Sequence, residues 1–135
     1  NWKNALVTPE ATVAEKLQMV ILGDFNDKIF TPDKLAAWIA FWGETQGRPI
    51  YTEICSAYDE ERTRAVSGLC EKIIKDGGYK LVPSTVMRAL ECLGDGLWLG
   101  VAAGNSQARF TITASQARMA LQATLVSFFP KHFPS

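Results

Sequence analysis

Several features that mark common classes of protein are missing from this sequence. Fourteen Lys and Arg residues balance fourteen Asp and Glu residues, so the 135-residue chain has no formal net charge. Contacts with nucleic-acid phosphates need a cluster of excess positive charge, so we expect no nucleic-acid-binding surface within these residues. The balance also argues against an acidic tail or a polybasic membrane anchor. No apolar run approaches the roughly 18 residues that a membrane-spanning helix needs.

Histidine and cysteine are too few for most catalytic and metal sites. The single histidine, His132, lies close to the chain end on what we expect to be a frayed tail. We therefore expect no zinc site and no nucleophile–base pair. The three cysteines, Cys55, Cys70 and Cys92, show no CxxC spacing. This odd, scattered set favours reduced, buried thiols in a cytoplasmic protein, and the sequence predicts no metal, no cofactor and no enzyme activity.

Helical periodicity runs through the whole chain, without the alternation and hairpin turns of strands. Apolar residues make up 47% of the sequence, which excludes general disorder, and the length fits one domain. Residues 1–7 fit the tail of an earlier helix. The apolar spacing predicts five further helices, over residues 11–27, 32–46, 49–76, 84–103 and 114–129.

Short motifs mark several of the predicted helix ends. Thr12 with Glu15 and Thr113 with Gln116 have the spacing of capping boxes, in which side chain and backbone bond reciprocally. The pair Gly77-Gly78 is a natural end for the long third helix, because glycine accepts the left-handed conformation that often follows a helix.

A line of small residues distinguishes the helix predicted over 84–103. Glycine costs a helix about 1 kcal/mol relative to alanine, so glycines at four-residue steps favour close approach of another helix. The alternative is that Gly104 is only a C-cap and the others are fortuitous. We expect the last two helices to form a hairpin that packs against a second copy under two-fold symmetry. The predicted dimer contacts are Cys92, Gly96, Gly100, Leu121, Leu125 and Phe128.

Aromatic residues cluster in the predicted second helix and recur on the third and fourth. Ring faces are electron-rich, so several converging rings can hold a quaternary ammonium ion. The alternative is that these rings are plain core. The predicted aromatic pocket walls are Trp38, Phe41, Trp42, Tyr58 and Trp98.

Asp95 lies one turn before Trp98 and borders a nearly uncharged run. A carboxylate is costly to bury without a partner. That partner is either a protein cation, such as Arg62 or Arg88, or a bound cationic ligand; otherwise Asp95 is hydrogen-bonded or hydrated. We predict Asp95 as the counter-charge of a cation site.

Two segments of this sequence resemble a known family. They are FTPDKLAAWIAFW, residues 30–42, and LGDGLWL, residues 93–99. Both resemble the C-terminal domain of TetR-family transcriptional repressors, specifically the BetI-type branch, and the resemblance covers about residues 12–129. It implies an all-α, five-helix bundle that senses a ligand and whose last two helices form a four-helix dimer interface. It also implies choline as the inducer and control of glycine betaine synthesis genes.

The resemblance implies a domain layout as well. A helix-turn-helix domain would precede residue 1, residues 1–10 would be the tail of a connecting helix or a linker, residues 11–130 the sensing and dimerisation domain, and residues 131–135 a C-terminal tail. The expected partners are a second copy of the chain, a small effector, and operator DNA reached only through the absent domain. A regulator with a different inducer, a structural helical dimer without a ligand site, and a small helical enzyme remain alternatives.

Overall fold

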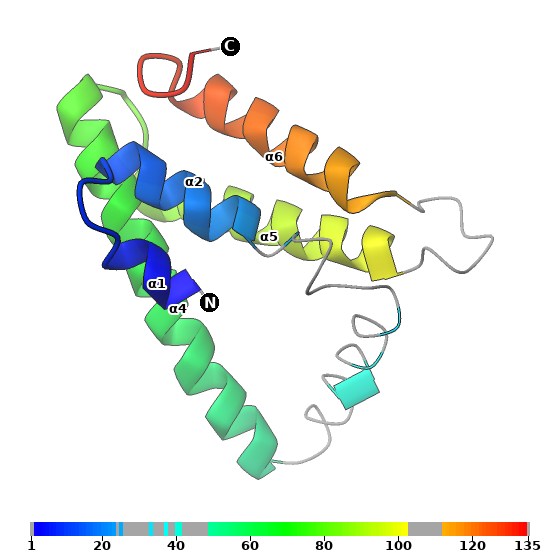
Figure 1. Ribbon diagram of the computed structural model, residues 1–135. Helices are drawn as coiled ribbons and strands as arrows, with labels where there is room; N and C mark the ends of the chain where they lie inside the picture. Colours follow the sequence, from blue (N-terminus) through cyan, green and yellow to red (C-terminus); the bar gives the residue numbers. More distant parts are fainter. Residues whose placement is uncertain are drawn as a thin grey trace.

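The computed structural model describes residues 2–23, 25, 33, 37, 40–41, 49–102 and 112–134, with only the backbone for residues 49–58 and 102. Its helices are α1 (Trp2–Leu6), α2 (Val13–Gly23), α4 (Pro49–Gly77), α5 (Pro83–Ala102) and α6 (Ala114–Phe128) (Figure 1). These described residues contain no strand. The prediction of an all-α fold is therefore confirmed.

The predicted helix boundaries agree best where end signals are strong. Helix α5 and helix α6 each agree to within one residue at both ends, and α4 runs one residue further than predicted. Helix α2 is shorter than the predicted 11–27, and α1 supplies the expected earlier helix. Most of the helix predicted over 32–46 lies outside the described residues.

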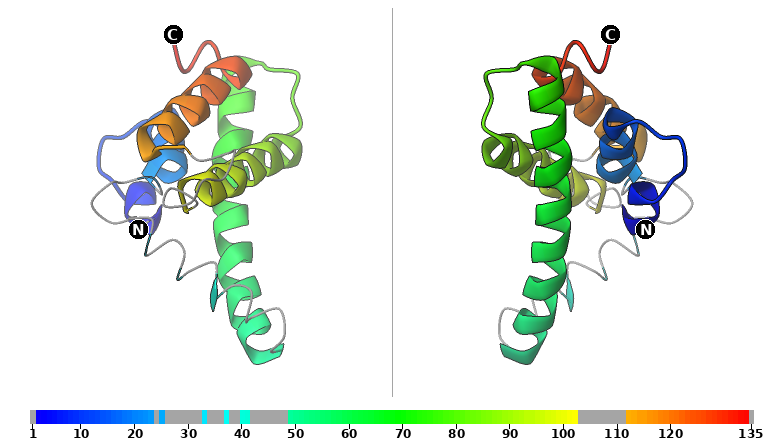
Figure 2. Two further views of the ribbon diagram at one scale, coloured as in Figure 1. Left: turned by 90° about the vertical axis from the view of Figure 1, so that its right-hand side faces the viewer. Right: turned by 90° about the vertical axis from the view of Figure 1, so that its left-hand side faces the viewer.

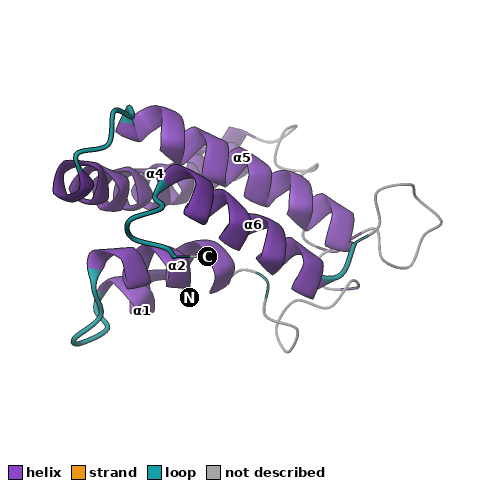
Figure 3. Ribbon diagram, turned by 90° about the horizontal axis from the view of Figure 1, so that it is seen from above, coloured by secondary structure: helices purple, strands orange, loops and turns teal. Residues whose placement is uncertain are grey.

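Helix α2 occupies the centre of the bundle, because it contacts α1, α4, α5 and α6. The long helix α4 crosses α5 and contacts both α2 and α5, and α1 lies next to α2 (Figures 1 and 2). Helices α5 and α6 run antiparallel and side by side (Figure 3). This arrangement leaves one side of the α5–α6 pair facing away from α2 and α4.

The core fills the space between α2, α4, α5 and α6. Burying a Leu, Val or Phe side chain stabilises the fold by about 1.5–3 kcal/mol, and each of these helices contributes several. The largest fully buried side chains are Phe129, Leu17, Ile73, Leu90, Leu121, Leu125, Val20, Val66, Val86 and Cys70.

Two predicted dimer contacts on α6 need correction. Leu121 and Leu125 have 0% exposed surface within a single chain, so neither has surface left to bury against a partner. The reason is that α6 packs on both α2 and α5, which takes up its most apolar stripe. Phe128 is partly buried and packs against the same core.

The glycine line on α5 also divides between two environments. Cys92 and Gly96 are exposed, whereas Gly100 is buried and its carbonyl accepts a hydrogen bond from the Ile112 N–H at 3.3 Å. At 3.6 residues per turn, each four-residue step rotates by about 40° around the helix, so the line turns inward before Gly100. The expectation that Cys92 is a buried thiol is wrong.

The end of α4 has the pattern of a Schellman motif. The Tyr79 N–H donates to the Ile74 carbonyl at 3.1 Å and the Gly78 N–H to the Lys75 carbonyl at 3.4 Å. Gly78 adopts a positive φ of 65°, the left-handed conformation that this motif requires. The pair Gly77-Gly78 therefore ends the helix as predicted.

The C-terminal segment after α6 is held against the end of α4 and is not frayed. The Lys131 N–H donates to the Tyr79 hydroxyl oxygen at 2.9 Å, and that hydroxyl lies 2.9 Å from Nδ1 of His132. Nε2 of His132 lies 2.7 Å from Asp76 Oδ2, and Phe133 is only 4% exposed. Since an ionised Asp76 carboxylate only accepts, Nε2 of His132 donates to it, and in a neutral imidazole Nδ1 then accepts the proton of the Tyr79 hydroxyl.

Candidate functional site

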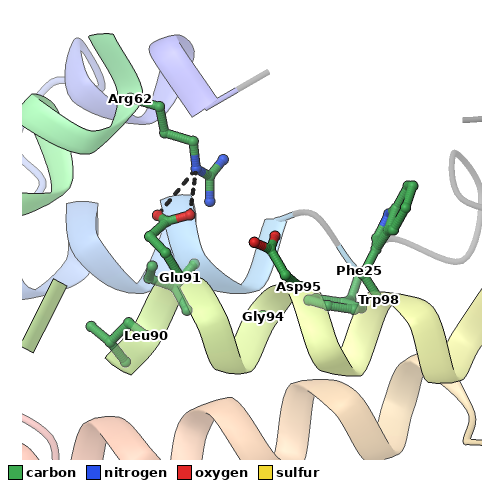
Figure 4. A pocket seen from close by; sticks show the side chains of 8 residues that line it. Phe25, Arg62, Leu90, Glu91, Gly94, Asp95 and Trp98 are labelled. Atoms are coloured by element: carbon green, nitrogen blue, oxygen red, sulfur yellow. Dashed lines mark hydrogen bonds and ion pairs between the residues drawn. The ribbon is translucent and has the colours of Figure 1, made fainter. Parts of the chain in front are cut away.

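A pocket of about 220 Å³ lies between α2, α4 and α5. This volume is below the roughly 300–1,000 Å³ that is typical of pockets for drug-sized ligands, and it corresponds to about seven water molecules at ~30 Å³ each. The pocket therefore suits a small ligand. Its lining residues are Ile21, Phe25, Arg62, Leu90, Glu91, Gly94, Asp95 and Trp98 (Figure 4).

An ion pair between α4 and α5 forms one end of the pocket. Nε of Arg62 lies 3.2 Å from both Oε1 and Oε2 of Glu91. The two side chains are only 14% and 23% exposed, so the pair is shielded more than a surface pair. Hydrogen bonds between ionised groups are stronger than neutral ones, and this pair ties the two helices together at the pocket wall.

Asp95 and two aromatic residues form the rest of the polar and aromatic wall. Asp95 follows Glu91 by one turn on α5 and lies between the Arg62–Glu91 pair and the side chains of Phe25 and Trp98 (Figure 4). Among the described lining residues, the ionisable side chains are one guanidinium, Arg62, and two carboxylates, Glu91 and Asp95.

The structure separates the predicted ligand-binding residues into three groups. Asp95 and Trp98 line the pocket, and their contact with a ligand stays a prediction. Phe41 is 44% exposed and is not among the lining residues. Trp38, Trp42 and the side chain of Tyr58 lie outside the described residues.

Several lining residues were not among the predicted site residues. Ile21 stands on the core stripe of α2 and Phe25 is buried two residues beyond the end of that helix, and a buried apolar residue gives no sign of a ligand site. Glu91 was detectable in principle, because it lies one turn before Asp95 on the same helix. Arg62 was visible as the only charge on the apolar side of the long helix, and it was considered as a partner for Asp95; its guanidinium contacts Glu91.

Two groups near the Arg62–Glu91 pair, Asp59 and Cys70, have raised pKa values. Burial raises the pKa of Asp59, one turn before Arg62, and the charge of Arg62 partly opposes this effect. Burial, reinforced by the negative charge of Glu91, raises the pKa of the Cys70 thiol from 9.0 to about 12. The charge of Glu91 at the pocket wall thus affects the pKa of a thiol in the core.

Neither a metal site nor a membrane span is visible in the part of the chain that the structure describes. No group of three or more His, Cys, Asp and Glu side chains lies close enough there to hold a metal ion. No helix within these residues is both long and apolar enough to cross a bilayer.

The second candidate surface is the side of α5 and α6 that faces away from the core. We call it the α5–α6 face. The six residues assigned to it are uncharged, the exposed Arg88 and Asp95 lie beside them on α5, and Leu99 and Met119 are 52% and 69% exposed. An ideal Cβ built on Gly96 meets nothing within 4 Å in the single chain. The face consists of Ala89, Cys92, Gly96, Leu99, Met119 and Ala123, all exposed.

The structure is an all-helical domain with a small pocket between α2, α4 and α5. Residues 13–130 match the family model described as BetI-type transcriptional repressor, C-terminal. The chain therefore belongs to this family, and the resemblance seen in the sequence is confirmed. The family is one of transcriptional repressors rather than enzymes. No curated protein and no solved structure matches the chain.

Proposed function

We propose that this domain senses a small organic cation, choline or a close relative, and that occupancy of the pocket controls DNA binding by a helix-turn-helix domain preceding residue 1. The observation that carries the proposal is the pocket wall, which sets two carboxylates and two aromatic residues around a space of about 220 Å³.

The chemistry of this wall favours a cation with an apolar surface. A quaternary ammonium group binds to ring faces such as that of Trp98 with about 0.5–2 kcal/mol per favourable contact. Asp95 is exposed, so its attraction to a cation 4 Å away lies between about 1 kcal/mol, as in water, and about 4 kcal/mol, as near a protein surface. An anion would be repelled by Asp95, and a neutral molecule would gain only the apolar contacts.

Control of DNA binding would follow from a population shift. A ligand changes an equilibrium only by its difference in affinity for the two arrangements. Helix α1 is the described segment closest in sequence to the proposed DNA-binding domain, and Lys3 on α1 pairs with Glu61 on α4 at 3.2 Å. Glu61 is adjacent to Arg62 of the pocket, so a movement of α4 at the pocket reaches α1 through neighbouring residues.

Two copies of the chain would associate through the α5–α6 face. An isologous contact uses the same surface on both copies, and this face offers uncharged, small and apolar side chains on two adjacent helices. The dimer would hold two DNA-binding domains at a fixed spacing, as a two-fold symmetric operator requires.

Calorimetric titration of the chain with choline and with 3,3-dimethylbutan-1-ol tests the proposal. The two molecules have nearly the same shape, but only choline is charged. We expect choline to bind and the alcohol to bind at least about tenfold more weakly, which corresponds to about 1.4 kcal/mol.

Asp95→Asn is the matching variant. We expect it to weaken choline binding about tenfold without changing the helical circular dichroism signal, because the substitution keeps the shape and removes the charge. Glu71→Gln is the control, since it removes one negative charge from an exposed site on α4 outside the pocket. Choline binding that is absent, or equal for Asp95→Asn and the unmodified chain, would contradict the assignment.

A further inference from the structure

Arg62 already holds one of the two carboxylates that a cationic ligand would use. Its Nε contacts both oxygens of Glu91 at 3.2 Å, and both residues line the pocket. A second cation approaching Glu91 would therefore meet a guanidinium of the same charge. In a partly buried site that repulsion is screened less than at the surface.

A second carboxylate for Arg62 stands on its own helix. Asp59 precedes Arg62 by three residues on α4, a spacing at which helical side chains are neighbours. Burial raises the pKa of Asp59 and the charge of Arg62 partly opposes this effect, so the two groups already interact. Rotation about the Arg62 side-chain bonds exchanges an inter-helix partner, Glu91, for an intra-helix partner.

We propose that Arg62 is the internal competing cation of this pocket, and that a bound organic cation displaces its guanidinium from Glu91 toward Asp59. This inference rests on the proposed function, because it requires that a cation enters the pocket. Arg62 thus acts as a specificity-determining residue, because a cation binds only if its contacts with the pocket wall offset the loss of the Arg62–Glu91 pair.

The displacement also explains how occupancy reaches the rest of the bundle. The Arg62–Glu91 pair joins α4 to α5 at the pocket wall, whereas a pair between Arg62 and Asp59 joins α4 only to itself. Binding therefore removes one link between these helices, and it does so next to Glu61, which pairs with Lys3 of α1.

Calorimetric titration of the full chain with tetramethylammonium chloride tests the competition. We expect Arg62→Met to bind this cation about fivefold more tightly than the unmodified chain, the size expected when a competing ion pair of about 1 kcal/mol is removed. Arg64→Met is the matched control, because Arg64 is an exposed arginine on the same helix that pairs with Glu60. We expect its affinity to equal that of the unmodified chain.

A second pair of variants tests the destination of the guanidinium and remains decisive if Arg62→Met does not fold. Asp59→Asn removes the alternative partner, so we expect it to weaken tetramethylammonium binding by about twofold to fivefold, consistent with a partly exposed ion pair. Glu60→Gln is the neighbouring control with the same change in charge, and we expect it to leave the affinity unchanged. Equal affinities for Asp59→Asn and Glu60→Gln would overturn the displacement.

Tighter binding by Arg62→Met would also follow from reduced repulsion alone, so a crystal structure of the chain with tetramethylammonium completes the test. We expect Nε of Arg62 to have left Glu91 and to lie next to Asp59. A complex in which both contacts with Glu91 persist overturns this inference and leaves the proposed function intact. If tetramethylammonium binds neither the unmodified chain nor Arg62→Met, the proposed cation site itself fails.

Discussion

At the scale of single residues, two cysteines of this chain have opposite environments. Cys70 is fully buried on α4 and Cys92 is exposed on α5. In a Cys55→Ser background that also carries Met119→Glu, so that the proposed dimer does not cover Cys92, we expect a thiol reagent at pH 8 to modify Cys92 quickly. We expect it to modify Cys70 only during unfolding, because the thiolate is the reactive form and Cys70 remains protonated. Mass spectrometry of labelled peptides measures both rates. Equal rates would contradict the burial of Cys70.

Ionisation of Cys70 makes the free energy of unfolding depend on pH in the alkaline range. The folded state holds the Cys70 proton up to about pH 12, whereas the unfolded chain releases it near 9.0. A raised pKa means that the folded state binds more protons in this window, so stability falls as the pH rises from 9 toward 12. In urea unfolding, we expect the stability deficit of Cys70→Ala to shrink between pH 8 and pH 10.5 by on the order of 1 kcal/mol.

The lining of the candidate pocket was only partly predictable from individual residues. Asp95 and Trp98 were found because a carboxylate next to an uncharged run and an aromatic ring is unusual. Phe25 and Ile21 were not, since an apolar residue on a helix stripe looks the same whether it fills the core or borders a pocket. Only the packing of α2 against α4 and α5 distinguishes the two cases.

At the scale of helices, two glycines of α4 should respond to alanine in opposite directions. A Cβ on Gly68 meets nothing within 4 Å, whereas a Cβ on Gly77 would lie 2.8 Å from Cδ2 of Tyr79. We expect Gly68→Ala to stabilise the chain by up to about 1 kcal/mol through helix propensity. We expect Gly77→Ala to destabilise it by about 1–3 kcal/mol through steric overlap. Urea unfolding at pH 7 measures both.

The Tyr79 ring has little freedom to relieve that overlap. Its hydroxyl accepts from the Lys131 N–H and contacts His132, and its ring packs on Phe129 with centroids 5.4 Å apart. The variant Tyr79→Leu, combined with Gly77→Ala, separates the steric effect from the backbone effect. If Gly77→Ala is equally destabilising with and without Tyr79, the ring contact is not the cause.

Helices were more predictable than their surroundings, because their ends carry local chemical signals. The capping box of Thr113 and Gln116 is present, with both hydrogen bonds formed, and α6 begins immediately after it. Thr12 accepts from the Glu15 N–H at 3.1 Å, as its spacing predicts. Helix α2 was overestimated at its C-terminal end because apolar spacing continues to Phe25, which is buried beyond the helix end at Gly23.

At the scale of the whole molecule, sequence reasoning identified the helices proposed for dimerisation but misassigned part of their surface. The most apolar residues of α6 were expected at the dimer contact, yet Leu121 and Leu125 belong to the core of one chain. A helix that is apolar on most sides packs against several other helices. For α6, two of these are α2 and α5 of the same chain. The exposed remainder, Met119 and Ala123, is less apolar and therefore less conspicuous in sequence.

The proposed dimer makes a sharp prediction for Met119, the most exposed residue of the α5–α6 face. Met119→Glu introduces a charge twice in an isologous contact, once from each copy, so we expect the dimer to weaken by at least about a hundredfold, or about 2.7 kcal/mol. Sedimentation velocity across a concentration series measures this change.

Val7→Glu is the matched control, because Val7 is 76% exposed and lies next to α1 rather than on this face. Since neither side chain is part of the core, both variants should unfold at the urea concentration of the unmodified monomer. A dimer of undiminished affinity in Met119→Glu would show that two copies associate through another surface, and a monomeric unmodified chain would remove dimerisation from these residues altogether.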